Sequence, residues 1–163
     1  MTPHAQKGNP TIVTPTEVVQ TFIEHLNQNR IDDAAGLLAE DVFYHNVPME
    51  PLNGREAWRA FNDEFGVGTR LRANWEILAI AESGDVVLTE RIDEFYNDEG
   101  RRIAIPVMGS FRVRDGVIAE WSDYFDMGDL VTEFGKLNNP TDHPDVEHHV
   151  GQQLEGRGEP RRS

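Results

Sequence analysis

An arginine and two aspartates have residue types and spacings that suit acid–base chemistry. Arg91 and Asp93 are two residues apart in a stretch, 88–96, that reads as a β-strand, so both side chains leave the same face. A charged pair among apolar neighbours is either an exposed ion pair, which contributes little, or a pair held inside a pocket, where burial is costly without pairing and hydrogen bonding. Taken alone, the pattern favours the exposed pair.

Two other strand-like stretches offer polar groups that match this pair. Tyr44 and Asn46 alternate onto one face of a short predicted strand. Taken alone, they read as a core tyrosine and a turn residue. Asp123 lies between Trp121 and Phe125 on one strand face, which is unusual for a solvent-facing carboxylate, although a half-exposed aspartate fits about equally well.

The order of the predicted strands brings these groups together. The stretches 86–96, 101–113 and 117–126 alternate with tight glycine-containing turns and predict an antiparallel meander. A curved sheet turns inward-facing residues of non-adjacent strands toward one concave pocket. Arg91 is then expected to lie between two carboxylates, one on its own strand and the other being Asp123.

Helical periodicity identifies the elements that cover this sheet. The first helix is predicted to begin at Thr14 as N-cap, with Pro15 in the first turn and Glu17 completing a capping box. Further helices are predicted over 31–38, from 54 to 65, and over 127–137, and strands over 41–48 and 70–81. The fold class is therefore α+β: a cone-shaped roll whose curved mixed or antiparallel sheet wraps around a pocket covered by the N-terminal helices.

Composition predicts one domain with flexible ends. The chain has 163 residues, 38% of them hydrophobic, which suits one core over residues 14–137. Polar, proline-broken ends predict a flexible arm over 1–13 and a flexible tail over 138–163. A net charge of -14 argues against nucleic acid and anionic membranes as partners. The absence of cysteine excludes thiolate chemistry, and the lack of a long apolar run or a signal-like N-terminus predicts a cytoplasmic protein.

In these motifs the sequence resembles the limonene-1,2-epoxide hydrolase family of the nuclear-transport-factor-2-like superfamily. The resemblance rests on Tyr44-x-Asn46, on Arg91-x-Asp93 and on the run 121–126, in matching order between about residues 15 and 137. Each motif is weak alone, and together they are fairly specific.

The resemblance implies a catalytic role for each of these residues. Asp93 would be the general acid that protonates the epoxide oxygen, and Asp123 the general base on the attacking water. Tyr44 and Asn46 would hold that water together with Asp123, while Arg91 bridges the two carboxylates. No metal, cofactor or covalent enzyme intermediate is implied, and a homodimer is expected from the resemblance and from the exposed meander.

The expected partners are water and a small hydrophobic epoxide, such as a cyclic terpene epoxide. The predicted substrate-binding residues are apolar and come from helices and strands alike: Phe22, Val47, Phe65, Leu78, Phe95, Ile105, Val107, Phe125, Leu130 and Phe134.

Two other classes of function remain open on this fold. An isomerase, cyclase or dehydratase would use an aspartate to remove a carbon-bound proton, but it leaves an arginine between two acids without a purpose. A non-catalytic ligand-binding protein gains nothing from two buried carboxylates. The histidines at 143, 148 and 149 lie in the polar tail and favour solvent exposure over metal binding. His45 is expected to point away from the pocket, and Asp126 to cap the last helix.

Overall fold

A computed structural model describes residues 13–138 of the chain. Its helices are α1 (Pro15–Asn27), α2 (Ile31–Gly36), α3 (Arg55–Phe65) and α4 (Met127–Asn138). Its strands are β1 (Leu38–Val47), β2 (Leu52–Asn53), β3 (Leu71–Ser83), β4 (Val86–Asn97), β5 (Arg102–Arg114) and β6 (Val117–Tyr124).

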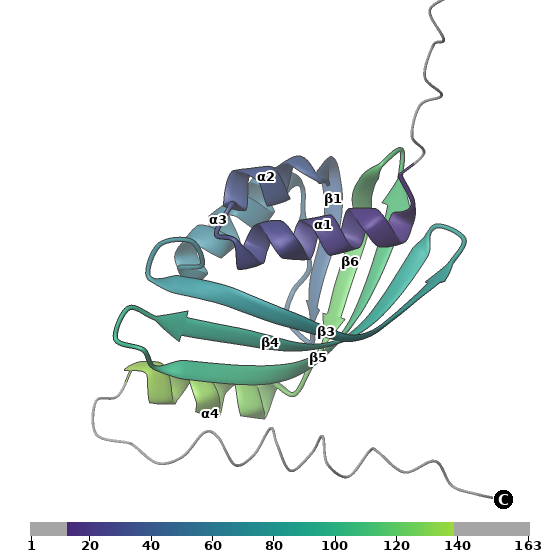
Figure 1. Cartoon of the computed structure of the whole chain (residues 1–163). Coiled ribbons are helices and arrows are strands. Elements are labelled where there is room, and N and C mark those ends of the chain that lie inside the picture. The colour runs from purple at the N-terminus through teal and green to yellow at the C-terminus, as the bar shows by residue number, and fades with distance from the viewer. Residues whose placement is uncertain (1–12, 139–163) are drawn as a thin grey trace, which may run out of the picture.

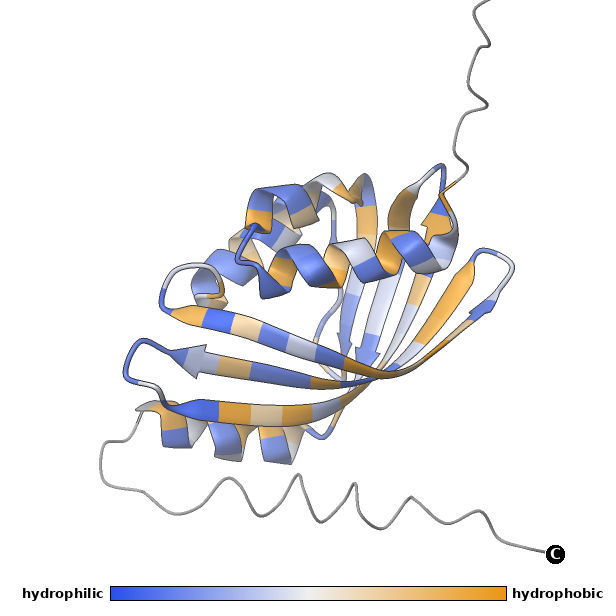
Figure 2. Cartoon of the chain, viewed as in Figure 1, coloured by the Kyte–Doolittle hydropathy of each residue, from blue (hydrophilic) through white to orange (hydrophobic). Residues whose placement is uncertain are grey.

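The six strands form one mixed sheet in the order β2-β1-β6-β5-β4-β3. The meander β3-β4-β5-β6 is antiparallel, and β1 adds to it in parallel with β6. The sheet is strongly curved, and α1, α2 and α3 lie over its concave face (Figure 1). Hydrophobic residues recur along α1 and alternate with polar ones along the strands (Figure 2), as a core between helices and sheet requires.

Helix α1 begins where its sequence predicts. The Thr14 hydroxyl accepts a hydrogen bond from the Glu17 backbone N–H at 3.2 Å, and the Glu17 carboxylate accepts one from the Thr14 N–H at 2.8 Å. This reciprocal pair satisfies two N–H groups that the first helical turn leaves free. The helix then buries one face against the sheet: Val18, Val19, Phe22, Ile23 and Leu26.

The predicted α+β roll is confirmed, with local differences. The first strand begins at Leu38 rather than Asp41, because α2 ends at Gly36 and its predicted last turn continues as strand. The short strand β2 lies between the predicted strand over 41–48 and the predicted helix from 54 to 65, where no strand is predicted. The predicted cap on the last helix is present, since the Asp126 carboxylate accepts hydrogen bonds from the N–H groups of Gly128 and Asp129 at 2.7 and 3.1 Å.

The predicted arm and tail lie almost wholly outside the described residues, and so do the three tail histidines. Among the helices within 13–138, none is long and apolar enough to cross a membrane.

Candidate active site

One row of residues runs across four strands on the concave face. Thr89 of β4 is paired with Gly109 of β5, Gly109 with Asp123 of β6, and Asp123 with Asn46 of β1. Arg91 lies two residues beyond Thr89 on β4 and therefore shares its face. The register thus carries the polar groups of three separate motifs to one place.

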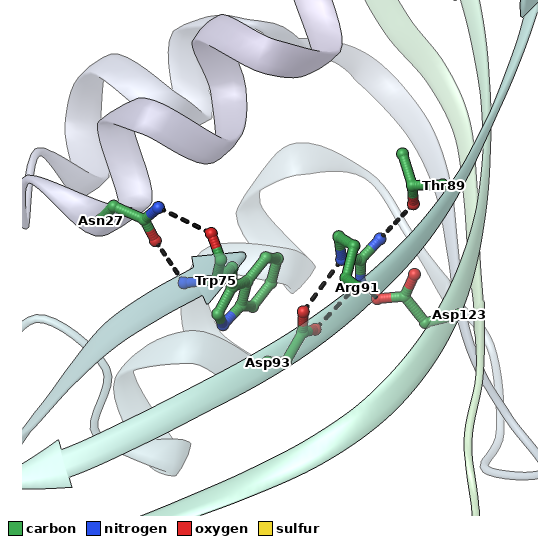
Figure 3. Close-up of polar contacts among 6 residues, drawn as sticks. All are labelled: Asn27, Trp75, Thr89, Arg91, Asp93 and Asp123. Carbon is green, nitrogen blue, oxygen red and sulfur yellow. Dashed lines mark hydrogen bonds and ion pairs between the residues drawn. The ribbon is translucent and has the colours of Figure 1, made fainter. Parts of the chain in front are cut away.

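The guanidinium of Arg91 lies between two carboxylates (Figure 3). Its Nε and one terminal nitrogen donate to the two oxygens of Asp93, each at 2.9 Å. The same terminal nitrogen donates to Asp123 Oδ2 at 2.9 Å, and the other donates to the Thr89 hydroxyl at 2.9 Å. Arg91 is 0% exposed, and the two aspartates are 4% exposed each. The pocket arrangement therefore holds, and the exposed ion pair that the motif favours by itself is excluded.

Two aromatic rings lie close to the guanidinium. Its carbon lies 5.0 Å from the centre of the Trp75 ring and 5.6 Å from that of Phe111, distances at which a cation and an aromatic ring attract. The backbone of Trp75 is itself held by Asn27 at the end of α1. The Asn27 side-chain amide donates a hydrogen bond to the Trp75 backbone carbonyl at 2.9 Å and accepts one from the Trp75 backbone N–H at 2.7 Å (Figure 3). Because β3 is the edge strand, Asn27 takes the place of a further strand there.

Gly109 gives Arg91 the space to cross β5. A Cβ at this position would stand 2.7 Å from the Thr89 hydroxyl and 2.9 Å from Asp123 Oδ1, and closer still to an Arg91 terminal nitrogen. Any other residue would displace the ion-pair network. Only a position without a side chain lets an arginine of β4 reach a carboxylate of β6.

Burial raises the pKa values of both carboxyl groups. It raises the pKa of Asp93 to about 6, although the Arg91 guanidinium favours the charged form and opposes this shift. The nearby Asp123 raises the pKa of Asp93 by a smaller amount. Burial also raises the pKa of Asp123, again opposed by Arg91. One guanidinium neutralises one carboxylate, so the buried group carries no net charge when the pair retains one proton. The two aspartates therefore titrate as a unit.

One oxygen of Asp123 and the indole nitrogen of Trp121 have no hydrogen-bond partners among the described residues. These two atoms, Asp123 Oδ1 and Trp121 Nε1, are both buried. The Trp121 N–H is near enough to favour the charged form of Asp123. Tyr44 and Asn46 line the same end of the cavity, and burial raises the pKa of the Tyr44 hydroxyl well above its usual value, so it stays protonated. Such a set of groups suits one bound water.

The cavity above this network has mainly apolar walls. It contains Tyr44, Asn46, Asp93 and Asp123, and six of the predicted substrate-binding residues line it: Phe65, Phe95, Ile105, Val107, Phe125 and Leu130. His45 lies outside this lining, as expected, and a ring nitrogen stands 2.9 Å from the Met49 carbonyl oxygen. Within 13–138 there is no group of three or more histidines and acidic residues that could hold a metal ion.

Four predicted lining residues lie elsewhere. Phe22 is fully buried in the core, and Leu26, one helical turn later, lines the cavity instead. Val47 shares its strand face with His45, opposite to Asn46. Leu78 falls in the register irregularity of β3 and is 37% exposed.

Phe134 is the fourth, and it lies behind the wall. Its ring contacts Phe65 at 4.7 Å and Phe95 at 5.8 Å between ring centres, so it supports two lining residues without lining the cavity itself.

Sequence reasoning missed several residues that the fold brings to the cavity. They are mostly large and lie on α1, α3, β3 and β6 and in the turn after α3: Leu26, Trp58, Phe61, Asn62, Val67, Trp75 and Trp121. Helical spacing from Phe65 back to Trp58, Phe61 and Asn62 was a usable signal for α3. The sequence carries no signal for the role of Gly109, because a glycine in a strand does not indicate which side chain of a neighbouring strand crosses it.

Known proteins resemble the chain in sequence and in fold. Residues 13–136 match the limonene-1,2-epoxide hydrolase catalytic domain. Epoxide hydrolase EphG of Mycobacterium tuberculosis (strain ATCC 25618 / H37Rv) is 32% identical over 114 residues, which cover 69% of this chain and 73% of that protein. The solved structure of a limonene-epoxide-hydrolase-like epoxide hydrolase from M. tuberculosis is 27% identical, with a TM-score of 0.66, and covers 76% of this chain and 91% of its own.

Proteins named for other chemistry share the fold. The structure of a proposed polyketide cyclase from Pseudomonas putida has a TM-score of 0.65 at 20% identity, covering 74% of this chain and 97% of its own. That likeness shows the nuclear-transport-factor-2-like fold alone. The two sequence matches are both to epoxide hydrolases, and each covers most of the chain. The protein belongs to the limonene-1,2-epoxide hydrolase family.

Proposed function

We propose that the protein adds water to a hydrophobic epoxide and releases a vicinal diol, in one step of general acid and general base catalysis. The observation that carries the proposal is the buried Arg91 bridging Asp93 and Asp123 at 2.9 Å each, at the edge of an apolar cavity. Two carboxyl groups that share one proton supply an acid and a base together.

The unpartnered oxygen supports the role of Asp123 as the base. Asp123 Oδ1 accepts no hydrogen bond within the described part of the chain, so it is free to accept a proton from water. Both oxygens of Asp93 contact Arg91, and its raised pKa keeps the shared proton available for donation. These contacts support Asp93 as the acid and Asp123 as its partner base.

The reaction is balanced without a further reactant. Water forms a bond to one epoxide carbon and loses a proton to Asp123. The carbon–oxygen bond breaks, and its oxygen takes the proton of Asp93. Transfer of the proton from Asp123 back to Asp93 restores the site. Tyr44 and Asn46 orient the water, which converts an encounter with solvent into a positioned attack.

The cavity favours a compact apolar substrate. Aromatic rings and branched aliphatic side chains make up most of its lining, with polar groups gathered at the acid pair. A cyclic, terpene-like epoxide fits this description.

Diol formation from a panel of epoxides tests the proposal. The panel contains a cyclic terpene epoxide, a linear alkyl epoxide and styrene oxide, and the product is measured by chromatography. The wild-type protein is expected to hydrolyse at least one of them, and Asp93→Asn and Asp123→Asn are each expected to lose more than about 100-fold in rate.

Exposed carboxylates supply the matched control. Asp98→Asn on the β4–β5 turn changes the same functional group far from the cavity and should leave the rate unchanged. If no epoxide were hydrolysed, or if either site variant kept the wild-type rate, the assignment would be wrong, and proton abstraction from carbon would become the better reading of the same pair.

A further inference from the structure

One buried polar side chain is not part of the proposed catalytic network. Among the described residues, five polar or charged side chains are buried: Asn62, Thr89, Arg91, Asp93 and Asp123. The last four form the network around the guanidinium. Asn62 lies on α3, in the helix layer that faces the sheet across the cavity, and it is only 8% exposed.

The orientation of the Asn62 carboxamide is fixed by its neighbour. Its Nδ2 donates a hydrogen bond to the Val67 carbonyl at 3.1 Å. A carbonyl oxygen only accepts hydrogen bonds, so the amide nitrogen must face Val67 and Oδ1 must face the other way. Within residues 13–138 no hydrogen bond reaches this Oδ1, although it is not fully enclosed by protein, and the side chain lines the cavity beside Phe61 and Phe65.

We infer that Asn62 Oδ1 accepts a hydrogen bond from a hydroxyl group of the substrate, which makes the preferred substrate a lipophilic epoxide with a hydroxyl group remote from the oxirane ring. The inference rests on the proposed function and narrows its substrate class. An acceptor in an apolar wall costs free energy when it stays unpaired, and a donor on the ligand removes that cost.

The surroundings favour a neutral donor over a charged one. A carboxylate would meet the oxygen of Asn62 and the acid pair, both of which repel it. An ammonium group would lose its hydration in this lining, where the carboxylates are those of Asp93 and Asp123 and both already contact Arg91. A hydroxyl group satisfies Oδ1 at small cost and leaves the rest of the substrate to the apolar lining.

Support of the turn after α3 explains the role of the Asn62 Nδ2 atom but not that of Oδ1. The bond from Nδ2 holds Val67, and the Asn62 backbone carbonyl accepts from the Gly66 N–H at 2.9 Å. A purely structural asparagine would matter equally for every substrate. A recognition residue would matter more for a substrate that carries the hydroxyl group.

The test compares two epoxides that differ in one hydroxyl group. The probes are a terpene epoxide and its analogue hydroxylated at the end opposite the oxirane. The wild-type kcat/KM should be higher for the hydroxylated epoxide, and Asn62→Leu should lower this ratio roughly 3- to 10-fold, the range of one net hydrogen bond. Phe61→Leu, a neighbouring change in the same lining, should leave the ratio unchanged. A ratio unaffected by Asn62→Leu would overturn the inference while leaving the hydrolase proposal standing.

Binding of unreactive ligands separates this inference from the proposed function. The Kd values of a terpene alcohol and its parent hydrocarbon are measured by the fluorescence of the tryptophans that line the cavity. The wild-type protein should prefer the alcohol about 3-fold or more, and Asn62→Leu should abolish the preference. Asn62→Ser is the second variant if leucine prevents folding. A preference lost in these variants would support the inference even if no epoxide were hydrolysed, and equal affinities in the wild type would refute it.

Discussion

Arg91 reaches a carboxylate two strands away because the residue between them has no side chain. Gly109 is paired with both Thr89 and Asp123, and the guanidinium passes over it. The spacing of the two carboxyl groups is thus set by a residue that has no side chain of its own. Gly109 is a positioning residue.

Replacing this glycine should stop catalysis without unfolding the protein. In Gly109→Ala the new methyl group displaces the Arg91 guanidinium and Asp123 Oδ1, and we expect kcat to fall by about 100-fold or more, as misplacement by roughly 1 Å can do. Gly36→Ala is the control, because a Cβ at that position meets no atom within 4 Å. Steady-state kinetics and circular dichroism of both variants check this. An active Gly109→Ala enzyme would show that the bridge tolerates movement.

The shared proton predicts how activity depends on pH. Burial raises the pKa of Asp93 to about 6, so the acid keeps its proton at lower pH and loses it as pH rises through that value. We expect kcat/KM to fall on the alkaline side, from about pH 6 or above, as the pair becomes doubly charged. A pH–rate profile measures this limb. Activity that rises steadily to pH 9 would contradict a protonated acid in the resting enzyme.

The catalytic motifs are predictable from strand alternation, whereas their supports are not. Alternation by two puts Arg91 and Asp93 on one face, as the sequence predicts, and burial of the pair follows from the helices above. Leu78 follows the same rule: Trp75 and Ile77 face the core, so Leu78 points outward, and its predicted place in the lining was wrong. Gly109 and Asn27 contact segments that are far apart in the chain, so no local sequence pattern predicts these contacts.

At the scale of elements, α1 is joined to β3 at both of its ends: Thr16 donates two hydrogen bonds to the Glu82 carboxylate near its start, and Asn27 bonds Trp75 at its last residue. The two hydrogen bonds of Asn27 to the Trp75 backbone tie the end of the helix to the edge of the sheet, next to the ring that packs on Arg91. The helix layer thereby fixes one side of the site. The periodicity of α1 predicts the helix and its buried face, but Asn27 lies at its last residue and reads as an ordinary terminus.

Removing this link should weaken both the fold and the site. Asn27→Ala deletes two hydrogen bonds, and we expect a loss of about 1–3 kcal/mol in the free energy of unfolding, together with a lower kcat because Trp75 becomes free to shift. Asn74→Ala is the matched control: its amide bonds only Glu94 on the exposed face. Urea denaturation and kinetics compare the two. Equal, small effects would show that the link is dispensable.

At the scale of the whole molecule, the outer face of the sheet remains uncovered in the single chain. It presents Leu88, Met108 and Tyr124, which are 49%, 52% and 53% exposed, and Met108 is paired directly with Tyr124. Neighbouring charges on this face are already paired, as in the contact of Arg102 with Glu94 at 3.1 Å. An apolar face bordered by neutralised charges suits a second copy of the same surface.

We therefore predict that two copies of the chain form a homodimer through this outer face of the sheet. Met108→Asp should convert a dimer into a monomer, as measured by light scattering after gel filtration, because it places a charge at the centre of the contact. Val131→Asp, on an exposed residue of α4, is the control and should change nothing. A wild-type protein that is monomeric at micromolar concentration would refute the prediction.

Asp93 and Asp123 are proposed to direct a water molecule onto an epoxide without a covalent enzyme intermediate. A single turnover of a cyclic terpene epoxide in H₂¹⁸O, followed by mass spectrometry of the diol and of the protein, tests this proposal most directly. Direct attack by water places one ¹⁸O atom in the diol from the first turnover and none in the protein. An unlabelled first-turnover diol, with ¹⁸O appearing in an aspartate, would show attack by a carboxylate and contradict the assignment of Asp123 as a base.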